Sequence, residues 1–336
     1  MSGPQRPRAG RRSPAPAAPS TPAPASAAAV AGVVVRAYGK FFEVALRDEP
    51  RSLLSTVKGS VKRERRRTDL VAVGDRVRLV DLGEGEGQIE AVEPRDRSLK
   101  RLARLTADTE QVVLANPDQA LFLFAVRDPT PHRRMLDRFL IMAERETLPA
   151  LVGVNKMDLD GPAPDGSPSL ARWIFRDYEA VYPVHYLSAG AGDGLPGLRD
   201  ALLGKITAVA GPSGVGKSSL LTALHASGER AVGPISEATG KGRHTTTATQ
   251  LYRLPGAPPT FVADTPGIRA LALHGVEPGE LDGCFPELRP YLDDCFYPDC
   301  THLHEPGCAV RAALAAGQIP AARYDSYAAL RRGDRA

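Results

Sequence analysis

One stretch, residues 206–224, constrains the fold of this chain more than any other. An apolar run, Ile206 to Ala210, precedes a turn rich in small residues, and an amphipathic run follows it. The turn reads Gly211, Pro212, Ser213, Gly214, Val215, Gly216, Lys217 and Ser218. This spacing fits G-x-x-x-x-G-K-[ST], in which backbone N–H groups and a helix N-terminus bind phosphate. A strand, a phosphate loop and a helix are predicted, with Lys217 on the β and γ phosphates and Ser218 on Mg²⁺; a plain glycine-rich turn is the alternative.

Two polar motifs follow apolar runs upstream of the phosphate loop. Runs at 119–125 and 150–154 flank an amphipathic stretch, 134–145, which predicts a βαβ unit and a parallel sheet. A third apolar run ends at residue 187. The motifs that follow the second and third runs are Asn155, Lys156, Met157 and Asp158, and then Ser188 and Ala189. Both lie at strand ends, where open α/β sheets bind ligands.

The first of these motifs predicts guanine recognition. An Asp158 carboxylate can accept hydrogen bonds from N1 and the exocyclic amine of guanine, which adenine cannot supply. Asn155 and Lys156 would pack around the base, and the backbone N–H of Ala189 would bind guanine O6. A polar loop is the alternative for Asn-Lys-x-Asp taken alone, but the phosphate loop in the same chain favours a nucleotide site.

Two further motifs after the phosphate loop complete a predicted Mg²⁺ site. The segment 240–247 is rich in Gly and lacks apolar periodicity, so a mobile loop is expected there. One of its threonines at 245–247, taken as Thr246, would ligate Mg²⁺ when a γ-phosphate is present. A predicted strand at 260–263 then ends in Asp264, which would hold the metal through water, and the N–H of Gly267 would sense the γ-phosphate.

Residues 31–105 are expected to form a small β-barrel that binds nucleic acid. Five short β-type runs lie at 32–37, 41–46, 52–58, 75–80 and 87–92. An OB-fold closes with five strands and presents loops to oligonucleotides. Residues 1–105 carry 21 Lys and Arg against 12 Asp and Glu, which indicates a polyanionic partner, an ordinary solvated basic face being the alternative. Phosphate contacts without base readout are expected of Lys62, Arg63, Arg65, Arg66, Arg67, Arg95, Arg97, Lys100, Arg101 and Arg104.

Three of the four cysteines lie close together near the C-terminus, in a spacing that indicates metal binding. Cys295, Cys300, His302 and Cys308 follow the pattern C-x4-C-x-H-x5-C and offer three thiolates and one imidazole to a tetrahedral Zn²⁺. Such a closed site is structural, because no coordination position is left for water. His304 competes as a ligand by spacing, and redox cysteines or an iron–sulfur cluster are other interpretations. Short helices are predicted at 309–316 and 321–332, and Cys284 is assigned to packing.

The composition of the N-terminal tail and the lengths of the apolar runs indicate a disordered start and a cellular compartment. Residues 1–30 combine Pro, Ala, Ser and Arg with no acidic residue, so a disordered tail is expected, with or without a role in nucleic-acid contact. No apolar run approaches the ~18 residues of a membrane span, and the start lacks the apolar region of a signal peptide. A cytosolic protein without a membrane partner is expected.

The phosphate loop, Asn155-Lys156-x-Asp158, Ser188-Ala189 and Asp264-x-x-Gly267 resemble the G motifs of Ras-like GTPases, but the guanine-reading pair precedes the phosphate loop. The order is circularly permuted. Together with the barrel, the loop around His244 and the Cys/His knot, it resembles the ribosome small-subunit-dependent GTPase A family (RsgA, also called YjeQ), from about residue 32 to residue 327.

This resemblance implies a cytoplasmic GTPase that binds the 30S subunit and 16S ribosomal RNA and acts late in subunit maturation. It also implies stimulation of GTP hydrolysis by the subunit. The family pattern Cys-x-His-x-x-Glu-Pro-Gly-Cys selects His302 as the fourth zinc ligand. A monomer is expected, because no dimerisation surface can be read from the sequence.

The features together predict a multidomain α/β protein with four parts. They are a disordered tail at 1–30, an OB-fold RNA-binding domain at 31–105, a circularly permuted GTPase domain with a Ras-like doubly wound sheet at 106–278, and a zinc-binding domain with C-terminal helices at 279–336.

The hydrolytic group is the least defined part of the predicted site. The position after the Asp-x-x-Gly motif, which holds a water-positioning Gln in Ras-like GTPases, is Ile268 here. A low intrinsic rate is therefore expected. His244 would suit positioning of the water, although an exposed or RNA-contacting His is as compatible with the sequence. Three other functions remain open: an ATPase or small-molecule kinase, a GTP-gated RNA-binding module with incidental hydrolysis, and another ribosome-assembly permuted GTPase.

Overall fold

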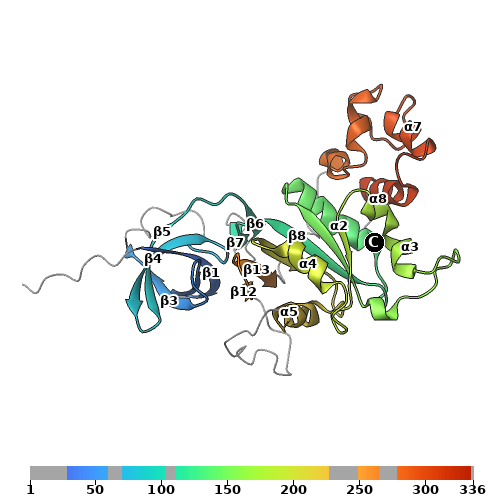
Figure 1. Cartoon of the computed structure of the whole chain (residues 1–336). Coiled ribbons are helices and arrows are strands. Elements are labelled where there is room, and N and C mark those ends of the chain that lie inside the picture. Colours follow the sequence, from blue (N-terminus) through green and yellow to red (C-terminus); the bar gives the residue numbers. More distant parts are fainter. Residues whose placement is uncertain (1–28, 60–69, 103–109, 227–248, 265–277, 334–336) are drawn as a thin grey trace, which may run out of the picture.

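The computed structural model describes residues 29–59, 70–102, 110–226, 249–264 and 278–333. Within these ranges a barrel, a six-stranded sheet with helices and a C-terminal region follow one another along the chain. Figure 1 shows the barrel and the C-terminal region at opposite ends of the sheet unit. The predicted fold class is confirmed. No helix of the described ranges is long and apolar enough to cross a bilayer.

The barrel closes with five strands in the order β1-β2-β3-β5-β4. Its strands are β1 (Val30–Tyr38), β2 (Phe41–Leu46), β3 (Ser52–Val57), β4 (Arg76–Gly83) and β5 (Glu86–Val92). Strand β3 runs parallel to β5, and the other pairs are antiparallel. Alternate residues of β3 are buried, as a strand with one face on a core requires. All five predicted strands are confirmed, and the pairing order is that of an OB-fold.

A two-stranded hairpin, β6 (Ser98–Leu102) and β7 (Glu110–Ala115), joins the barrel to the sheet. The barrel turn at Gly74 packs against it so closely that a Cβ on Gly74 would lie 2.0 Å from the carbonyl oxygen of Ala115. Asn116 extends this contact, since its Nδ2 donates to the Gly74 carbonyl at 3.1 Å. The sequence pattern did not predict this hairpin.

Arg95 also belongs to this junction rather than to a phosphate-binding surface. Its guanidinium bonds both carboxylate oxygens of the fully buried Asp75, at 2.7 and 2.8 Å. A second expected phosphate contact, Arg97, donates to the carbonyl of Pro117 at 3.2 Å. The interpretation of Arg95 as a phosphate contact is therefore wrong, because its Nε and Nη2 bind the buried carboxylate of the barrel turn. Residues 62–67 and Arg104 lie outside the described residues.

The sheet has the order β10-β9-β8-β11-β13-β12. Its strands are β8 (Gln119–Ala125), β9 (Ala150–Asn155), β10 (Val184–Tyr186), β11 (Ile206–Ala210), β12 (Gln250–Leu254) and β13 (Thr260–Asp264). All pairs are parallel except β12 with β13. The permuted strand order can be numbered from β11, so that β11, β12, β13, β8, β9 and β10 are the first to the sixth strand. Read from the β12 edge, the sheet then has the order second, third, first, fourth, fifth and sixth. The edge strand β12 was not predicted.

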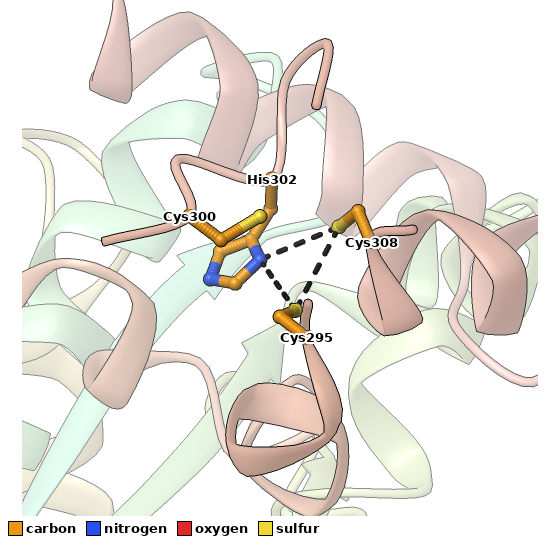
Figure 2. A group of neighbouring side chains, drawn as sticks. All are labelled: Cys295, Cys300, His302 and Cys308. Carbon is orange, nitrogen blue, oxygen red and sulfur yellow. Dashed lines mark hydrogen bonds between the residues drawn. The ribbon is translucent and has the colours of Figure 1, made fainter. Parts of the chain in front are cut away.

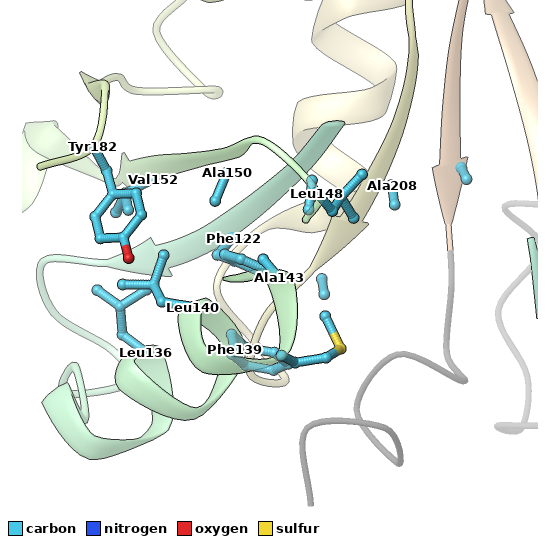
Figure 3. Packing of buried hydrophobic residues seen from close by; sticks show 14 of the residues in the cluster. Phe122, Leu136, Phe139, Leu140, Ala143, Leu148, Ala150, Val152, Tyr182 and Ala208 are labelled. Atoms are coloured by element: carbon cyan, nitrogen blue, oxygen red, sulfur yellow. The ribbon is translucent and has the colours of Figure 1, made fainter. Parts of the chain in front are cut away.

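Helices cover both faces of the sheet. Helices α2 (Arg133–Arg145) and α3 (Leu170–Glu179) pack on one face, and α4 (Leu195–Leu202) and α5 (Lys217–Ala226) pack on the other. Phe122 of β8 stacks on Phe139 of α2 with ring centroids 5.2 Å apart (Figure 3). Leu121 and Leu123 of the same strand point to the opposite face and pack in the core beneath α4 and α5. Every residue of β8 is buried for this reason. The predicted α2 is confirmed; α3 and α4 were not predicted.

The C-terminal region is built from short helices around its own core. They are η2 (Pro278–Glu280), η3 (Asp282–Cys284), η4 (Arg289–Asp294), α7 (Ala309–Ala315) and α8 (Ala321–Arg331); a further short helix, η1 (Met157–Leu159), follows β9. Phe285, Leu288, Val310 and Tyr327 are fully buried in this core. The two predicted C-terminal helices are confirmed.

Two arginines fix the flanking units on the sheet unit. Arg323 of α8 is buried and binds Asp137 of α2. At the opposite end, Arg253 of β12 donates to the carbonyls of Leu46 and Glu49 in the barrel, both at 2.6 Å. The C-terminal region thus contributes the arginine at its own contact with the sheet unit, whereas the sheet unit contributes the arginine at the contact with the barrel.

Candidate functional site

Parallel register brings the ends of four strands to one edge of the sheet. Val209 of β11 pairs with Leu121 of β8 and with Asp264 of β13. Asn155 of β9 lies opposite Ala125 of β8. The phosphate loop, Asn155 and Asp264 therefore leave the sheet at the same edge, which is where open α/β sheets bind ligands.

The phosphate loop wraps closely over β8 and β9. A Cβ on Gly211 would lie 2.1 Å from the carbonyl oxygen of Leu123, and one on Gly216 would lie 2.4 Å from Asn155 Nδ2. Both positions therefore require glycine. Lys217 Nζ donates to the carbonyls of Gly211 and Pro212 at 3.0 and 2.7 Å. The ammonium thus lies over the loop whose N–H groups are expected to face phosphate.

Asn155 connects the phosphate loop to the Ser188-Ala189 motif. It is buried, its Nδ2 donates to the Val215 carbonyl at 2.8 Å, and its Oδ1 accepts the Ala189 N–H at 2.9 Å. Ser188 Oγ in turn donates to Asp158 Oδ1. The side-chain amide of Asn155 therefore fixes two loops that are 60 and 34 residues away from it in sequence.

The exposed carboxylate of Asp158 follows Lys156, which adopts a left-handed conformation with φ +62°. With this turn, Lys156 Nζ donates to the carbonyl of Asp128, which follows the end of β8. Asp128 was not predicted as part of the site, because it contributes only a backbone oxygen. The arrangement leaves Asp158 open at the sheet edge, where a planar base could meet it.

Two of the three predicted Mg²⁺ ligands, Asp264 and Ser218, lie within the described residues. Burial raises the pKa of Asp264, and the positive charge of Lys217 opposes that effect. Ser218 is exposed in the first turn of α5. His244, Thr246 and Gly267 lie outside the described residues, as does Ile268.

The four predicted zinc ligands form one cluster in the C-terminal region (Figure 2). His302 Nδ1 lies 3.4 Å from Cys295 Sγ and 3.5 Å from Cys308 Sγ, and the two sulfurs are 3.9 Å apart. All four ligand atoms, that of Cys300 included, lie within 4.8 Å of one another. Zn–S bonds of 2.3 Å at tetrahedral angles imply sulfur separations of about 3.8 Å. The cluster could therefore hold a tetrahedral metal ion.

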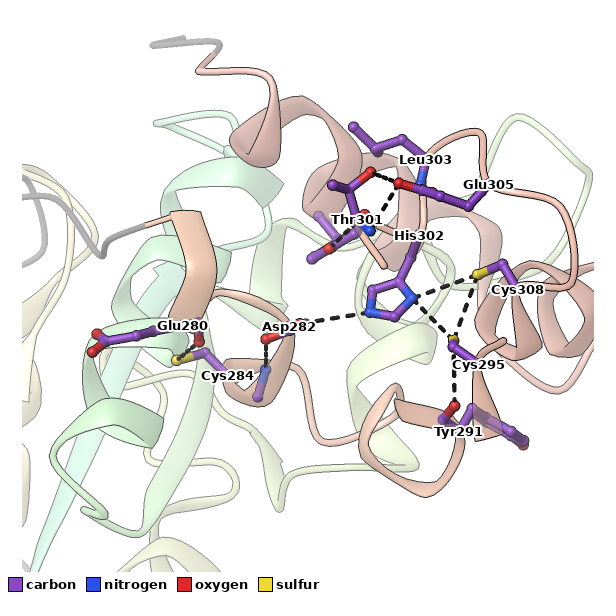
Figure 4. A network of polar contacts seen from close by, with 12 residues as sticks. Glu280, Asp282, Cys284, Tyr291, Cys295, Thr301, His302, Leu303, Glu305 and Cys308 are labelled. Atoms are coloured by element: carbon purple, nitrogen blue, oxygen red, sulfur yellow. Dashed lines mark hydrogen bonds and ion pairs between the residues drawn. The ribbon is translucent and has the colours of Figure 1, made fainter. Parts of the chain in front are cut away.

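The surrounding residues orient the His302 ring (Figure 4). Its second nitrogen, Nε2, faces Asp282 Oδ2 at 3.5 Å, so Nδ1 is directed at the three sulfurs. Tyr324 donates to the His302 carbonyl at 2.6 Å. Asp282 was missed in the sequence because it lies twenty residues before its partner and outside the Cys/His spacing.

Burial and distance separate His304 and Cys284 from the metal cluster. The His304 side chain is 81% exposed and is not a member of the cluster. Cys284 is buried in the local core, where its thiol donates to the Glu280 carbonyl at 3.3 Å and burial raises its pKa. Its assignment to packing is confirmed.

A phosphate loop on the central strand of a six-stranded sheet, with the predicted guanine-reading motif earlier in the chain, defines the class of circularly permuted P-loop GTPases. These are GTP-hydrolysing enzymes. The RsgA GTPase family model matches residues 92–274, and the chain belongs to this family.

Similar proteins cover nearly the whole chain. The small ribosomal subunit biogenesis GTPase RsgA of Gemmatimonas aurantiaca is 43% identical over 303 residues, which are 89% of this chain and 96% of that protein. The protein of the same name from Chlorobaculum parvum is 38% identical over 309 residues, 90% and 97% of the two chains.

Two solved structures share the fold. YjeQ from Thermotoga maritima has a TM-score of 0.72 and 31% identity and covers 91% of this chain and 99% of its own. YloQ, described as a circularly permuted GTPase, has a TM-score of 0.69 and 27% identity and covers 92% and 96%.

Proposed function

We propose that this chain binds GTP with Mg²⁺ at the carboxyl edge of its sheet and hydrolyses it while bound to the 30S ribosomal subunit, late in subunit maturation. The observation that carries the nucleotide part is Asn155, whose buried amide joins the phosphate loop to the Ser188-Ala189 turn. Relatives that share most of their length with this chain are named small ribosomal subunit biogenesis GTPases, which supports the ribosomal part.

The guanine base is recognised by Asp158, with Asn155, Lys156 and Met157 packed around it. Ser188 holds the Asp158 carboxylate in place. The backbone N–H of Ala189 donates to Asn155 Oδ1 without nucleotide and exchanges or shares this bond when it binds guanine O6. A carboxylate at this position selects guanine over adenine, because only guanine offers two donors along that edge. This selection disfavours an ATPase or small-molecule kinase.

The phosphates and the metal are bound at the start of α5. The loop N–H groups from Gly211 to Ser218 surround the phosphates, and Lys217 exchanges its two carbonyl contacts for phosphate oxygens. Mg²⁺ is held by Ser218 and Thr246, and by Asp264 through water. The Gly267 N–H contacts the γ-phosphate.

Hydrolysis is slow in the free protein and is stimulated by the subunit. Ile268 cannot orient a water molecule, so another group must do so. We assign that role to His244. The same residue Ile268 supports a second function, a GTP-gated RNA-binding module in which hydrolysis is incidental.

The barrel, residues 31–105, contacts 16S ribosomal RNA, whereas 106–278 form the GTPase domain and 279–336 the zinc-binding domain. Exposed Lys40, Arg47 and Arg78 supply positive charge on the barrel, and the exposed rings of Tyr38 and Phe41 lie opposite one another across β1 and β2. The protein acts as a monomer in the cytoplasm, where its subunit substrate matures.

Zn²⁺ is the ion that best fits Cys295, Cys300, His302 and Cys308. Three thiolates and one imidazole at the separations given above match its tetrahedral preference. The ion would cross-link η4, the 300–302 turn and the start of α7, and it leaves no position for a substrate water.

Steady-state GTP hydrolysis tests the proposal, measured for the protein alone and with purified small subunits, large subunits or whole ribosomes. Small subunits should raise turnover strongly and large subunits should not. Unchanged turnover with bound small subunits would favour the GTP-gated module, and a protein that binds no subunit would remove the ribosomal assignment. Asp158→Asn serves as the base-recognition control, because an amide can donate to the C2 carbonyl of xanthine: this variant should lose GTP and gain xanthosine triphosphate.

A further inference from the structure

The turn between the first two metal-site cysteines exposes two adjacent aromatic rings. Phe296 is 76% exposed and Tyr297 is 41% exposed, and their ring centroids are 5.0 Å apart in an edge-to-face arrangement. Phe296 has the largest exposed fraction of the large apolar side chains in the described ranges. An aromatic ring gains nothing from this exposure in the isolated chain, so a contact surface is indicated.

The position of this pair is fixed by the backbone rather than left to a free loop. The Phe296 N–H donates to the carbonyl of Gly307 at 3.1 Å, and the N–H of Cys300 donates to the carbonyl of Tyr297 at 3.2 Å. Gly307 has φ +69°, and a Cβ there would lie 3.0 Å from Phe296 Cβ. Cys295 and Cys300, which flank the turn, both belong to the candidate metal cluster. The rings are therefore presented on a preorganised support.

The surroundings of the pair are acidic. Asp293 and Asp294 precede it and Asp299 follows it, and all three are exposed. No ion pair within 4.0 Å joins any of them to a basic side chain of the described ranges. The segment 278–333 as a whole contains eight Asp and Glu, five Arg and no Lys. One of those arginines, Arg323, is buried and paired, so the surface charge of this unit is opposite in sign to that of the basic first third of the chain.

We propose that Phe296 and Tyr297, with Asp293, Asp294 and Asp299 around them, form a docking surface for a basic protein segment that carries arginine or lysine. The aromatic faces attract cationic side chains, and the carboxylates add charge complementarity. A phosphate backbone is the wrong partner, because it would meet three unpaired carboxylates. The partner is taken to be a protein component of the small subunit, and this last step rests on the proposed function.

The sign of one charge effect separates a protein partner from an RNA partner. The full-length protein, loaded with a non-hydrolysable GTP analogue, is titrated against purified small subunits. The variants are Phe296→Ala with Tyr297→Ala, Asp293→Asn with Asp294→Asn and Asp299→Asn, and the control Asp325→Asn, which removes an exposed charge from α8. Zinc content is measured for each variant to show that the metal site is intact.

The aromatic double variant should bind about tenfold more weakly. The triple Asn variant should also bind more weakly, by about three- to tenfold at low salt and less at high salt, while Asp325→Asn binds as the wild type does. Tighter binding by the triple Asn variant would overturn the proposal in favour of RNA. Equal binding by all variants would show that the surface is not engaged.

A second measurement keeps the inference independent of the ribosomal assignment. Labelled peptides of the same length, one with alternating Arg and Leu and one with alternating Glu and Leu, are titrated against the wild type and the aromatic double variant, together with a single-stranded RNA of similar length. The Arg peptide alone should lose affinity on loss of the two rings. If the wild type fails to bind subunits but this difference appears, the proposed function fails and the docking surface stands. If the difference is absent, the docking surface fails.

Discussion

Replacing Arg323 by Met should release the C-terminal region from α2. Arg323 and Asp137 are each 1% exposed at their side chains, and Glu287 is 6% exposed. The Arg323 guanidinium contacts Glu287 at 2.5 Å and also Asp137, and its Cζ lies 4.7 Å from the centroid of the Phe285 ring and 5.0 Å from that of Tyr178. Every face of this cation is therefore used.

The loss in stability follows from the charges that remain. Met fills much of the volume but leaves two buried carboxylates without a cation, and breaking a buried pair in this way costs about 3–5 kcal/mol. Arg323→Lys should also lower the free energy of unfolding, but by less than Arg323→Met does. The ammonium keeps the positive charge but cannot bond two carboxylates through a planar fork. Removing the exposed pair of the same interface, Arg289 with Glu144 at 2.6 Å, should cost under about 1 kcal/mol.

Urea unfolding monitored together with amide hydrogen exchange is the assay. The Arg323→Met variant should lose exchange protection across α7 and α8, while the sheet strands keep theirs, and Arg289→Ala should exchange as the wild type does. Equal stability of the Met variant and Arg289→Ala would refute the reasoning, because it would mean that the buried cation contributes no more than a surface ion pair.

Three further substitutions test the nucleotide site, the α3 cap and the metal centre. Gly216→Ala should weaken GTP binding by about tenfold or more, because its Cβ would displace the Asn155 amide; Gly190→Ala, where a Cβ meets open space, should bind normally in the same fluorescence titration. Burial acts to raise the pKa of Asp160, but hydrogen bonds from Ser169 and from the backbone at the start of α3 outweigh it and hold the pKa below its usual range. The stabilisation by Asp160 is therefore present above about pH 4 and is lost as the pH falls further. Asp160→Asn should destabilise the protein by about 1 kcal/mol at pH 7 and by much less at pH 3, and an equal effect at both pH values would contradict the assignment. Cys308→Ser should abolish stoichiometric zinc binding and expose the C-terminal core to hydrogen exchange, with GTP affinity unchanged; retained zinc would remove Cys308 from the ligand set.

The sequence alone was sufficient wherever chemistry depends on residues that are close together in the chain. The strand, loop and helix around 206–224 were predicted from a single stretch, and the five barrel strands were predicted from short β-type runs separated by turn residues. The Cys/His spacing identified all four members of the metal cluster. Local conformation and ligand type are encoded in such short segments, so they can be read without a partner.

Tertiary structure decided the features that join distant segments. The edge strand β12 has a weak pattern of its own and is stabilised by pairing with β13. Arg95 reads as part of a basic cluster, yet it holds Asp75 twenty residues away. Asn155 and Arg323 find partners up to 60 and 186 residues distant. No periodicity records these pairs, because they depend on which surfaces meet once the sheet and its flanking units have packed.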